Sequence, residues 1–181
     1  MTSGSPEQSP ARAPVLALGL GNLLLGDDGC GLRLLAELSG QIQDRGVEFL
    51  DGGTMGLSLL GRLEGRPAIL ILDAVGLGAA PGTIHMLREA ELGALRAHRA
   101  STPHEGNALE LLEALVLLDG ALPRIAVIGI EPEIVRPGAV LSRSIEEAIP
   151  RALEQARRVL DEMLQDAGRL ESSRQVGPLS T

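Results

Sequence analysis

The stretch "LALGLGNLLLGDDGCGLRLLAEL", from Leu16 to Leu38, contains a strand, a turn and a helix in direct succession. Its first apolar run ends at Gly21, and leucines at helical spacing follow the adjacent carboxylates of Asp27 and Asp28. A buried strand that leads through a glycine turn into a helix is typical of the first unit of a parallel α/β sheet. The two aspartates therefore stand where the first strand meets its helix.

The rest of the chain repeats this alternation of strands and helices. Strands are expected at residues 14–21, 47–50, 66–75, 83–87 and 124–130, with 83–87 at an edge of the sheet. Helices are expected near residues 27–39, 57–63, 90–97, 108–118 and 142–164, and Pro150 is expected to kink or restart the last one. The pattern predicts a single α/β domain over residues 14–165, with a twisted, mostly parallel central sheet of about five strands flanked by helices on both faces.

The expected strand order gives this sheet one place for a ligand. In the common doubly wound order 2-1-3, the first and third strands are neighbours, and open α/β sheets bind ligands at the carboxyl ends of such a pair. Both ends of the chain lie outside this arrangement. Residues 1–13, which are rich in serine and proline, and residues 166–181 are expected to be disordered tails.

Composition excludes several classes of function. The chain of 181 residues is 44% hydrophobic, carries a net charge of −8 and has no Trp, no Tyr and only one Phe, so binding to nucleic acid or to an anionic membrane is not expected. All 16 residues counted as Lys or Arg are Arg, which removes lysine-based chemistry. No apolar stretch is long enough for membrane insertion, and the single cysteine, Cys30, suits a reducing compartment. We therefore expect a cytoplasmic protein.

Three polar side chains are candidates for one shared site. Asp28 follows the first predicted strand, and Asp73 ends the apolar run "ILIL" of the third. An aspartate at the end of a fully apolar strand is costly to desolvate unless it is paired or metal-bound. His104 lies in a loop before a helix and could reach the same edge of the sheet. Two carboxylates and one imidazole would form an open divalent site for zinc or nickel, with a vacancy for water or substrate.

Simpler structural roles compete with this metal site. Asp27 is well placed to cap the first helix, and Asp28 could merely favour the helix dipole. Asp73 could be a helix cap or a loop acceptor, and His104 an ordinary loop histidine. Cys30 stands at a helix start but has no obvious base, so a packed thiol is expected rather than a nucleophile.

Other residues and motifs point to structural roles or away from nucleotide binding. His85 is expected to be structural or exposed, and Asp51 to cap the second helix or to fix the turn before it. The dinucleotide fingerprint is incomplete, because Leu24 fills the position of its third glycine. The chain also has no Walker lysine, and two acids stand where phosphate would need N–H donors.

Six segments between about residues 14 and 165 form a specific combination: "LGLGNLLLGDDGCGLRLLAEL", "LDGGTMGLSLLGRL", "ILILDAV", "APGTIHMLR", "STPHEGNALELLEAL" and "VIGIEPEIVRPGAVLSRSIEEAIPRALE". This combination resembles the hydrogenase maturation endopeptidases, which process the large subunit of nickel–iron hydrogenases. The resemblance implies an α/β fold and removal of a C-terminal extension from the large-subunit precursor after nickel insertion. That precursor is then the expected partner.

The resemblance also assigns the site residues. The metal ligands, which would also carry the catalytic function, fall on Asp28, Asp73 and His104; the first ligand is Glu in some members and the shorter Asp here. The nickel would be presented by the hydrogenase subunit, and zinc or another divalent ion could occupy the site of the isolated protein. No other cofactor is expected. We assign substrate contact to the "DGGT" loop, which consists of Asp51, Gly52, Gly53 and Thr54.

The sequence leaves the chemistry of cleavage open. The metal could serve as a recognition element, polarise the scissile carbonyl or activate a water, or Asp28 or Asp73 could act as general base. The chain lacks the His-Glu-x-x-His helix of common zinc peptidases. Two other functions compete with proteolysis: a non-proteolytic nickel-binding maturation chaperone, and a small-molecule hydrolase or nucleotide binder on the same type of sheet.

Overall fold

The computed structural model describes residues 12–43, 46–98, 108–119 and 123–175. Five strands form one sheet in the order β2-β1-β3-β5-β4; they are β1 (Val15–Leu20), β2 (Val47–Gly53), β3 (Ala68–Ala74), β4 (Ile84–Arg88) and β5 (Arg124–Ile130). All pairs are parallel except β4 with β5. The predicted α/β class, the mostly parallel sheet and the pairing of the first with the third strand are confirmed.

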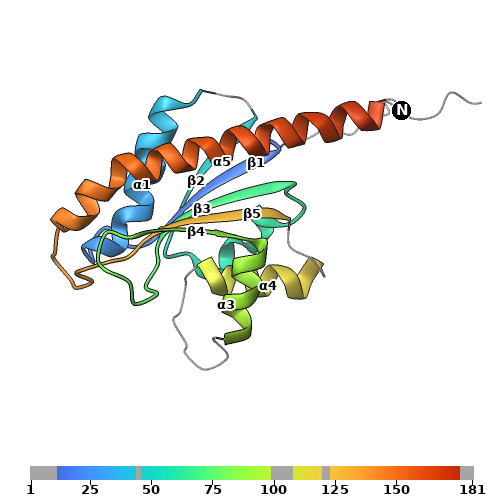
Figure 1. Cartoon of the computed structure of the whole chain (residues 1–181). Helices are drawn as coiled ribbons and strands as arrows, with labels where there is room; N and C mark the ends of the chain where they lie inside the picture. The colour runs from blue at the N-terminus through green and yellow to red at the C-terminus, as the bar shows by residue number, and fades with distance from the viewer. Residues whose placement is uncertain (1–11, 44–45, 99–107, 120–122, 176–181) are drawn as a thin grey trace, which may run out of the picture.

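Helices cover both faces of the sheet, as the sequence predicted. On one face lie α1 (Cys30–Gln41) and α5 (Arg143–Gln175), and on the other lie α2 (Leu60–Leu63), α3 (Glu89–His98) and α4 (Ala108–Asp119), with the 3-10 turn η2 (Gly56–Leu59) before α2 (Figure 1). Alternate residues of β1 supply the two cores: Val15 and Ala17 pack toward α1 and α5, whereas Leu16 and Leu18 pack toward α2 and α4.

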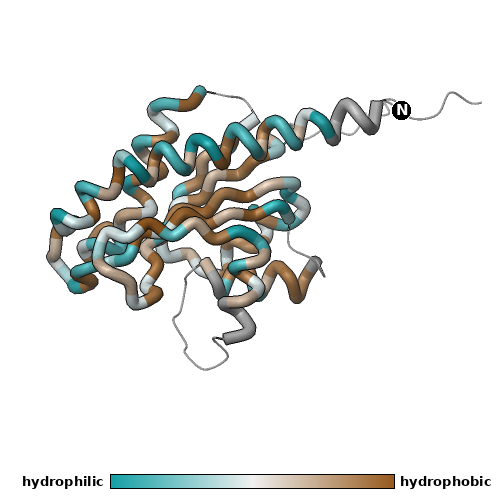
Figure 2. The backbone as a smooth tube through the Cα atoms, viewed as in Figure 1, coloured by the Kyte–Doolittle hydropathy of each residue, from teal (hydrophilic) through white to brown (hydrophobic). Residues whose placement is uncertain are grey.

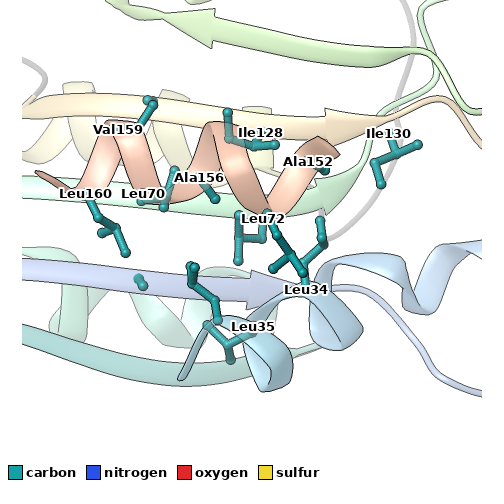
Figure 3. Close-up of a cluster of buried hydrophobic side chains, with 14 of the residues drawn as sticks. Leu34, Leu35, Leu70, Leu72, Ile128, Ile130, Ala152, Ala156, Val159 and Leu160 are labelled. Carbon is teal, nitrogen blue, oxygen red and sulfur yellow. The ribbon is translucent and has the colours of Figure 1, made fainter. Parts of the chain in front are cut away.

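Consecutive residues of β1, β3 and β5 are buried, so these strands are covered on both faces. The hydropathy-coloured trace is mostly brown, the colour of apolar residues, in the central sheet (Figure 2). In the close-up of the first core, Ala152 and Ala156 of α5 lie over Leu70 and Leu72 of β3 (Figure 3). The small alanine side chains let α5 pack directly against the sheet, with larger residues such as Leu160 beside them. The two cores together fix the carboxyl ends of the parallel strands at one edge of the molecule.

The last helix is longer than the sequence suggested. α5 continues through Pro150 without a break, so Pro150 does not restart the helix. Ala148, Ile149, Ala152 and Leu153 around it are buried, and this packing offsets the backbone hydrogen bond that proline cannot make. Residues 166–175, predicted as part of a disordered tail, are helical, whereas residues 1–11 and 176–181 of the predicted tails lie outside the described residues.

The turn between β1 and α1 depends on two glycines that allow close approach. Gly21 has a φ of 118°, and a Cβ there would overlap the carbonyl oxygen of Asp28. A Cβ at Gly31 would overlap the carbonyl oxygens of Leu20 and Leu72, at the ends of β1 and β3. These glycines therefore let the 3-10 turn η1 (Asp27–Gly29) and the start of α1 sit directly on the carboxyl edge of the sheet.

Asp27 is a buried structural hub, and the prediction that it caps the first helix is wrong. Neither η1 nor α1 has a side-chain cap. The Asp27 carboxylate, fully buried, instead accepts hydrogen bonds from the backbone N–H groups of Glu133, Ile134 and Ser142 and from the Ser142 hydroxyl, at 2.6–2.8 Å. Ser142 in turn accepts from the N–H of Ile145 in the first turn of α5. The carboxylate thus ties η1 to the loop between β5 and α5.

These bonds set the protonation of Asp27. Burial acts to raise the pKa of Asp27, but the hydrogen bonds from Ser142, Ile134 and Glu133 outweigh it and lower the pKa below its ordinary value. The carboxylate is therefore charged at neutral pH and interacts with aligned N–H dipoles. No short sequence pattern could indicate these partners, because they lie more than a hundred residues along the chain.

We predict that Asp27→Ala lowers the free energy of unfolding by roughly 3–5 kcal/mol, because several buried donors lose their acceptor at once. Urea unfolding of the purified variant measures this loss. Asp51→Ala is the control, since Asp51 is exposed, and it should change stability by less than about 0.5 kcal/mol. A loss below about 1 kcal/mol in Asp27→Ala would contradict the stabilising role of the Asp27 carboxylate.

Candidate functional site

Asp28 and Asp73 meet at the carboxyl ends of β1 and β3. Asp73 is the second-to-last residue of β3 and is 4% exposed. Its two carboxylate oxygens accept hydrogen bonds from the N–H groups of Ala74 at 2.8 Å and Ala108 at 3.2 Å. Asp28, in η1, is only partly buried and accepts from the N–H of Asn22 at 2.7 Å. The two aspartates thus lie at the same end of the sheet, beside the topological switch point, and Asp28 is near enough to raise the pKa of Asp73.

The environment of Asp73 disfavours a negative charge. Burial raises the pKa of Asp73 to about 7, against the lowering effect of the N–H groups of Ala108 and Ala74, and the nearby charge of Asp28 raises it further. Among the ion pairs of the described residues, none includes either aspartate. A buried carboxylate next to a second carboxylate is suited to binding a cation, which would offset the cost of burying its charge.

The third predicted ligand, His104, lies outside the described residues, so its position relative to the aspartates stays a prediction. Within the described parts of the chain, no three His, Cys, Asp or Glu side chains group closely enough to hold a metal ion. The two aspartates alone offer hard oxygen ligands but too few of them. They fit a divalent ion only if further donors come from His104 or from a bound partner.

The first residue of α4 connects Asp73 to the segment that carries His104. Ala108, the first residue of α4, donates its N–H to Asp73. The "STPHEGN" segment that carries His104 ends directly before Ala108. The start of α4 is therefore fixed to the buried carboxylate of the site.

Cys30 is close to the site but is not equipped for chemistry. It is buried at the start of α1. Burial and the negative charges of Asp73, Asp27 and Asp28 raise the pKa of the Cys30 thiol, which keeps it protonated at neutral pH. A protonated, buried thiol agrees with the expected packing role rather than with a nucleophile.

The substrate-contact residues predicted in the "DGGT" loop form the end of β2 and the turn after it. Asp51 and Thr54 are exposed, whereas Gly52 is buried, and a Cβ there would overlap side chains of Leu18 and Leu59. Gly52 is therefore required by packing. Asp51 does not cap the following turn, because η2 has no side-chain cap. Contact of this loop with substrate stays a prediction.

Sequence reasoning missed Glu131, a further carboxylate at the same edge of the sheet as Asp27, Asp28 and Asp73. It follows β5, is 8% exposed in its side chain, and accepts from the N–H groups of Leu77 and Gly78 at 2.8 and 2.9 Å and lies 2.9 Å from Nε2 of His85. His85 thus has a structural role, as expected. The "IEPE" sequence after β5 was the available signal, since a carboxylate directly after a buried strand needs a partner.

Glu131 holds the loop that follows Asp73. Burial acts to raise the pKa of Glu131, but hydrogen bonds from Leu77, His85, Gly78 and Ala79 outweigh it and lower the pKa below its ordinary value. The backbone of Glu131 also bonds to Thr83 and Gly82 on the far side of the loop. The chain between β3 and β4 is therefore anchored on one ionised side chain.

Comparison with known proteins identifies the family. The family model HycI, described as hydrogenase maturation protease, matches residues 32–159. The Hydrogenase 2 maturation protease of Escherichia coli K12 is 37% identical over 150 residues, which span 82% of this chain and 91% of that protein. This chain belongs to the hydrogenase maturation protease family.

Solved structures of this family of peptidases agree in fold. The hydrogenase maturating endopeptidase HybD of E. coli superposes with a TM-score of 0.70 at 38% identity, covering 82% of this chain and 92% of that chain. The [NiFe] hydrogenase maturation protease HybD of Thermococcus kodakarensis gives a TM-score of 0.64 at 29% identity, over 80% and 97% of the two chains. The hydrogenase maturation proteases thus share the sheet that positions Asp28 and Asp73. Of the helices in the described residues of this member, none combines the length and apolar character needed to cross a membrane.

We predict that Glu131→Gln removes a pH-dependent part of the stability. The folded-state pKa of Glu131 lies below the ordinary value of 4.5, so its contribution is complete above that value and is lost as the pH falls through the folded-state pKa. Wild type should therefore exceed Glu131→Gln by about 2 kcal/mol at pH 7, and the difference should shrink between pH 5 and pH 3. Chemical unfolding at several pH values measures it.

Glu133→Gln is the matched control for this pH series. Glu133 lies in the loop after β5, as Glu131 does, but it is exposed, and its carboxylate accepts a hydrogen bond from the Ser144 hydroxyl. Its unfolding free energy should follow that of wild type over the whole range. A Glu131→Gln protein whose deficit is the same at pH 3 and pH 7 would show that the ionised carboxylate does not hold the loop.

Proposed function

We propose that this protein is the endopeptidase that removes the C-terminal extension of a nickel–iron hydrogenase large-subunit precursor after nickel insertion. Family membership supports peptide-bond hydrolysis in hydrogenase maturation. The observation that carries the finer proposal is the position of Asp28 and the buried Asp73 together at the switch point of the sheet, where Asp73 has no ion-pair partner among the described residues. Nickel on the precursor is the cation that this pair recognises.

His104 is the proposed third ligand. It precedes Ala108 by four residues, a length of chain that spans about 14 Å at most. Because the N–H of Ala108 is bonded to Asp73, the imidazole is within reach of the same ion. Two oxygens and one nitrogen leave the coordination shell open, so a nickel ion that brings its own ligands from the precursor completes it.

We assign a separate role to each of the residues in and around this site. Asp28 and Asp73 offer carboxylate oxygens, and when ionised either can accept a proton from the water that attacks the scissile bond. Glu131 and Asp27 act at a distance from the ion, by holding the loops on either side. Asp51, Gly53 and Thr54 lie at the end of the adjacent strand, where we propose contact with the precursor chain.

Recognition of a metal-loaded partner explains how a peptidase with so small a site avoids general proteolysis. The isolated protein would bind a free divalent ion such as zinc only modestly, because three ligands do not close the shell. Binding of the precursor then depends on the difference in affinity between its loaded and unloaded forms. The proposal places this reaction in the cytoplasm, where a precursor can be loaded before it is assembled.

We predict that the protein releases a C-terminal peptide from nickel-loaded precursor and not from nickel-free precursor. Mass spectrometry of the two mixtures measures the loss. Asp28→Ala, Asp73→Asn and His104→Ala should each slow release by at least about 100-fold, the scale of losing a group that acts in the transition state. Cys30→Ser should release the peptide at the wild-type rate.

The unfolding midpoint of each variant separates loss of the site from loss of the fold. Equal cleavage of loaded and nickel-free precursor would contradict nickel recognition. Stable binding of loaded precursor without any peptide release would instead favour a maturation chaperone. A folded Cys30→Ser protein that fails, beside an active His104→Ala protein, would assign the chemistry to the thiol.

A further inference from the structure

Exposed apolar side chains gather on the loops around the site. The loops after β1, β2 and β5 all leave the carboxyl edge of the sheet, and six large apolar residues on them face solvent. We call these the apolar rim: Leu23, Leu24, Met55, Leu57, Val135 and Val140. Leu24 and Val140 are 73% and 83% exposed, which is unfavourable for side chains that nothing covers.

The rim is a connected surface rather than three separate loops. The N–H of Gly21 bonds to the carbonyl of Gly53, which joins the loops after β1 and β2. The N–H groups of Gly138 and Arg136 bond to the carbonyls of Leu24 and Leu25, which joins the loops after β1 and β5. Its backbone is therefore positioned before any partner binds, which lowers the ordering cost of association.

The apolar rim lies next to the aspartates of the η1 turn, both along the chain and in space. Leu23 directly follows Asn22, whose N–H is bonded to the Asp28 carboxylate. Val135 forms a bridge with Gly26, next to the Asp27 hub. A partner that covers the rim therefore also reaches the carboxylates of the site.

Charge restricts what that partner can be. The exposed or partly exposed ionisable residues of these three loops are Asp28, Glu133 and Arg136, and Asp51 is exposed at the end of β2 beside them. Acids are the majority, so an acidic segment would be repelled. A second copy of the chain fits poorly, because a two-fold contact would place this mostly acidic surface of one copy against the same surface of the other. A stretch of polypeptide with apolar side chains and no acidic ones fits both the rim and its charge.

We infer that the apolar rim is the docking surface for the precursor segment next to the cleaved bond, and that this segment is apolar and non-acidic. The inference rests on the proposed function, since it takes the precursor as the partner. The aspartates recognise the metal, and the rim recognises the chain beside it. Removing rim contacts then weakens precursor binding without altering the groups at the reacting bond.

The test is a double variant, Leu24→Ser with Val140→Ser, assayed for peptide release over a range of nickel-loaded precursor concentrations. KM should rise at least about tenfold with kcat little changed, as expected for loss of a buried apolar contact at an interface. The control is Leu117→Ser with Leu118→Ser, on α4, which are 85% and 61% exposed and lie outside the rim. Its KM should equal that of wild type.

The possible results separate the inference from the function on which it rests. If wild type releases no peptide, the proposed function fails. If wild type releases peptide and the rim variant has an unchanged KM, or if the control variant has the same defect, the docking surface is refuted alone. Met55→Ser provides an independent single variant with the same expected rise in KM. Sedimentation decides the remaining case: a wild-type dimer that the rim variant converts to monomers would overturn the inference in favour of self-association.

Discussion

Parallel pairing of β1 with β3 is the constraint on which the site depends. Beyond the pair of Gly19 with Leu72, β1 continues for one residue to Leu20 and β3 for two to Ala74. Asp73 is thereby buried beside the turn that follows β1, and Gly31 allows α1 to begin directly above both strand ends. Because the apolar cores on the two faces fix this register, the carboxylates are brought together by the fold and remain together despite their mutual repulsion.

The adjacent aspartates of the "DDG" turn have opposite tasks. Asp27 is surrounded by N–H donors and stabilises the loop between β5 and α5, whereas Asp28 has one backbone donor and a partly open environment. Glu131 resembles Asp27 in its use of N–H donors, at the other side of Asp73. Asp27 and Glu131 therefore hold the loops, whereas Asp28 and Asp73, which accept fewer hydrogen bonds within the described parts of the chain, are the two that we propose for a ligand. This division separates stability from recognition at a single edge of the sheet.

Local patterns were enough to predict the strands and the aspartates at their ends, because burial on both faces is visible in short segments. The order 2-1-3 of the first three strands followed from the common doubly wound arrangement, whereas the place of β5 between β3 and β4 was not predicted. The partners of Asp27 and Glu131 were not predictable, since donors such as Ser142 and Leu77 lie far along the chain. The extent of α5 was underestimated because Leu164 and Ala167 continue its buried stripe into a segment rich in charged and polar residues. His104 was a candidate from its place in a loop before a helix, and the family resemblance gave it the role of a ligand.

We propose that Asp28 and Asp73 bind the nickel of the precursor. Nickel K-edge X-ray absorption tests it most directly, with the loaded precursor measured alone and again after rapid freezing with this protein. We predict that, in the complex, the nickel gains oxygen or nitrogen donors at about 2.0–2.2 Å, the usual range for carboxylate and imidazole ligands. Asp28→Ala or Asp73→Asn should remove part of this change. A nickel shell that is identical with and without the wild-type protein, in a mixture that goes on to release the C-terminal peptide, would contradict the account.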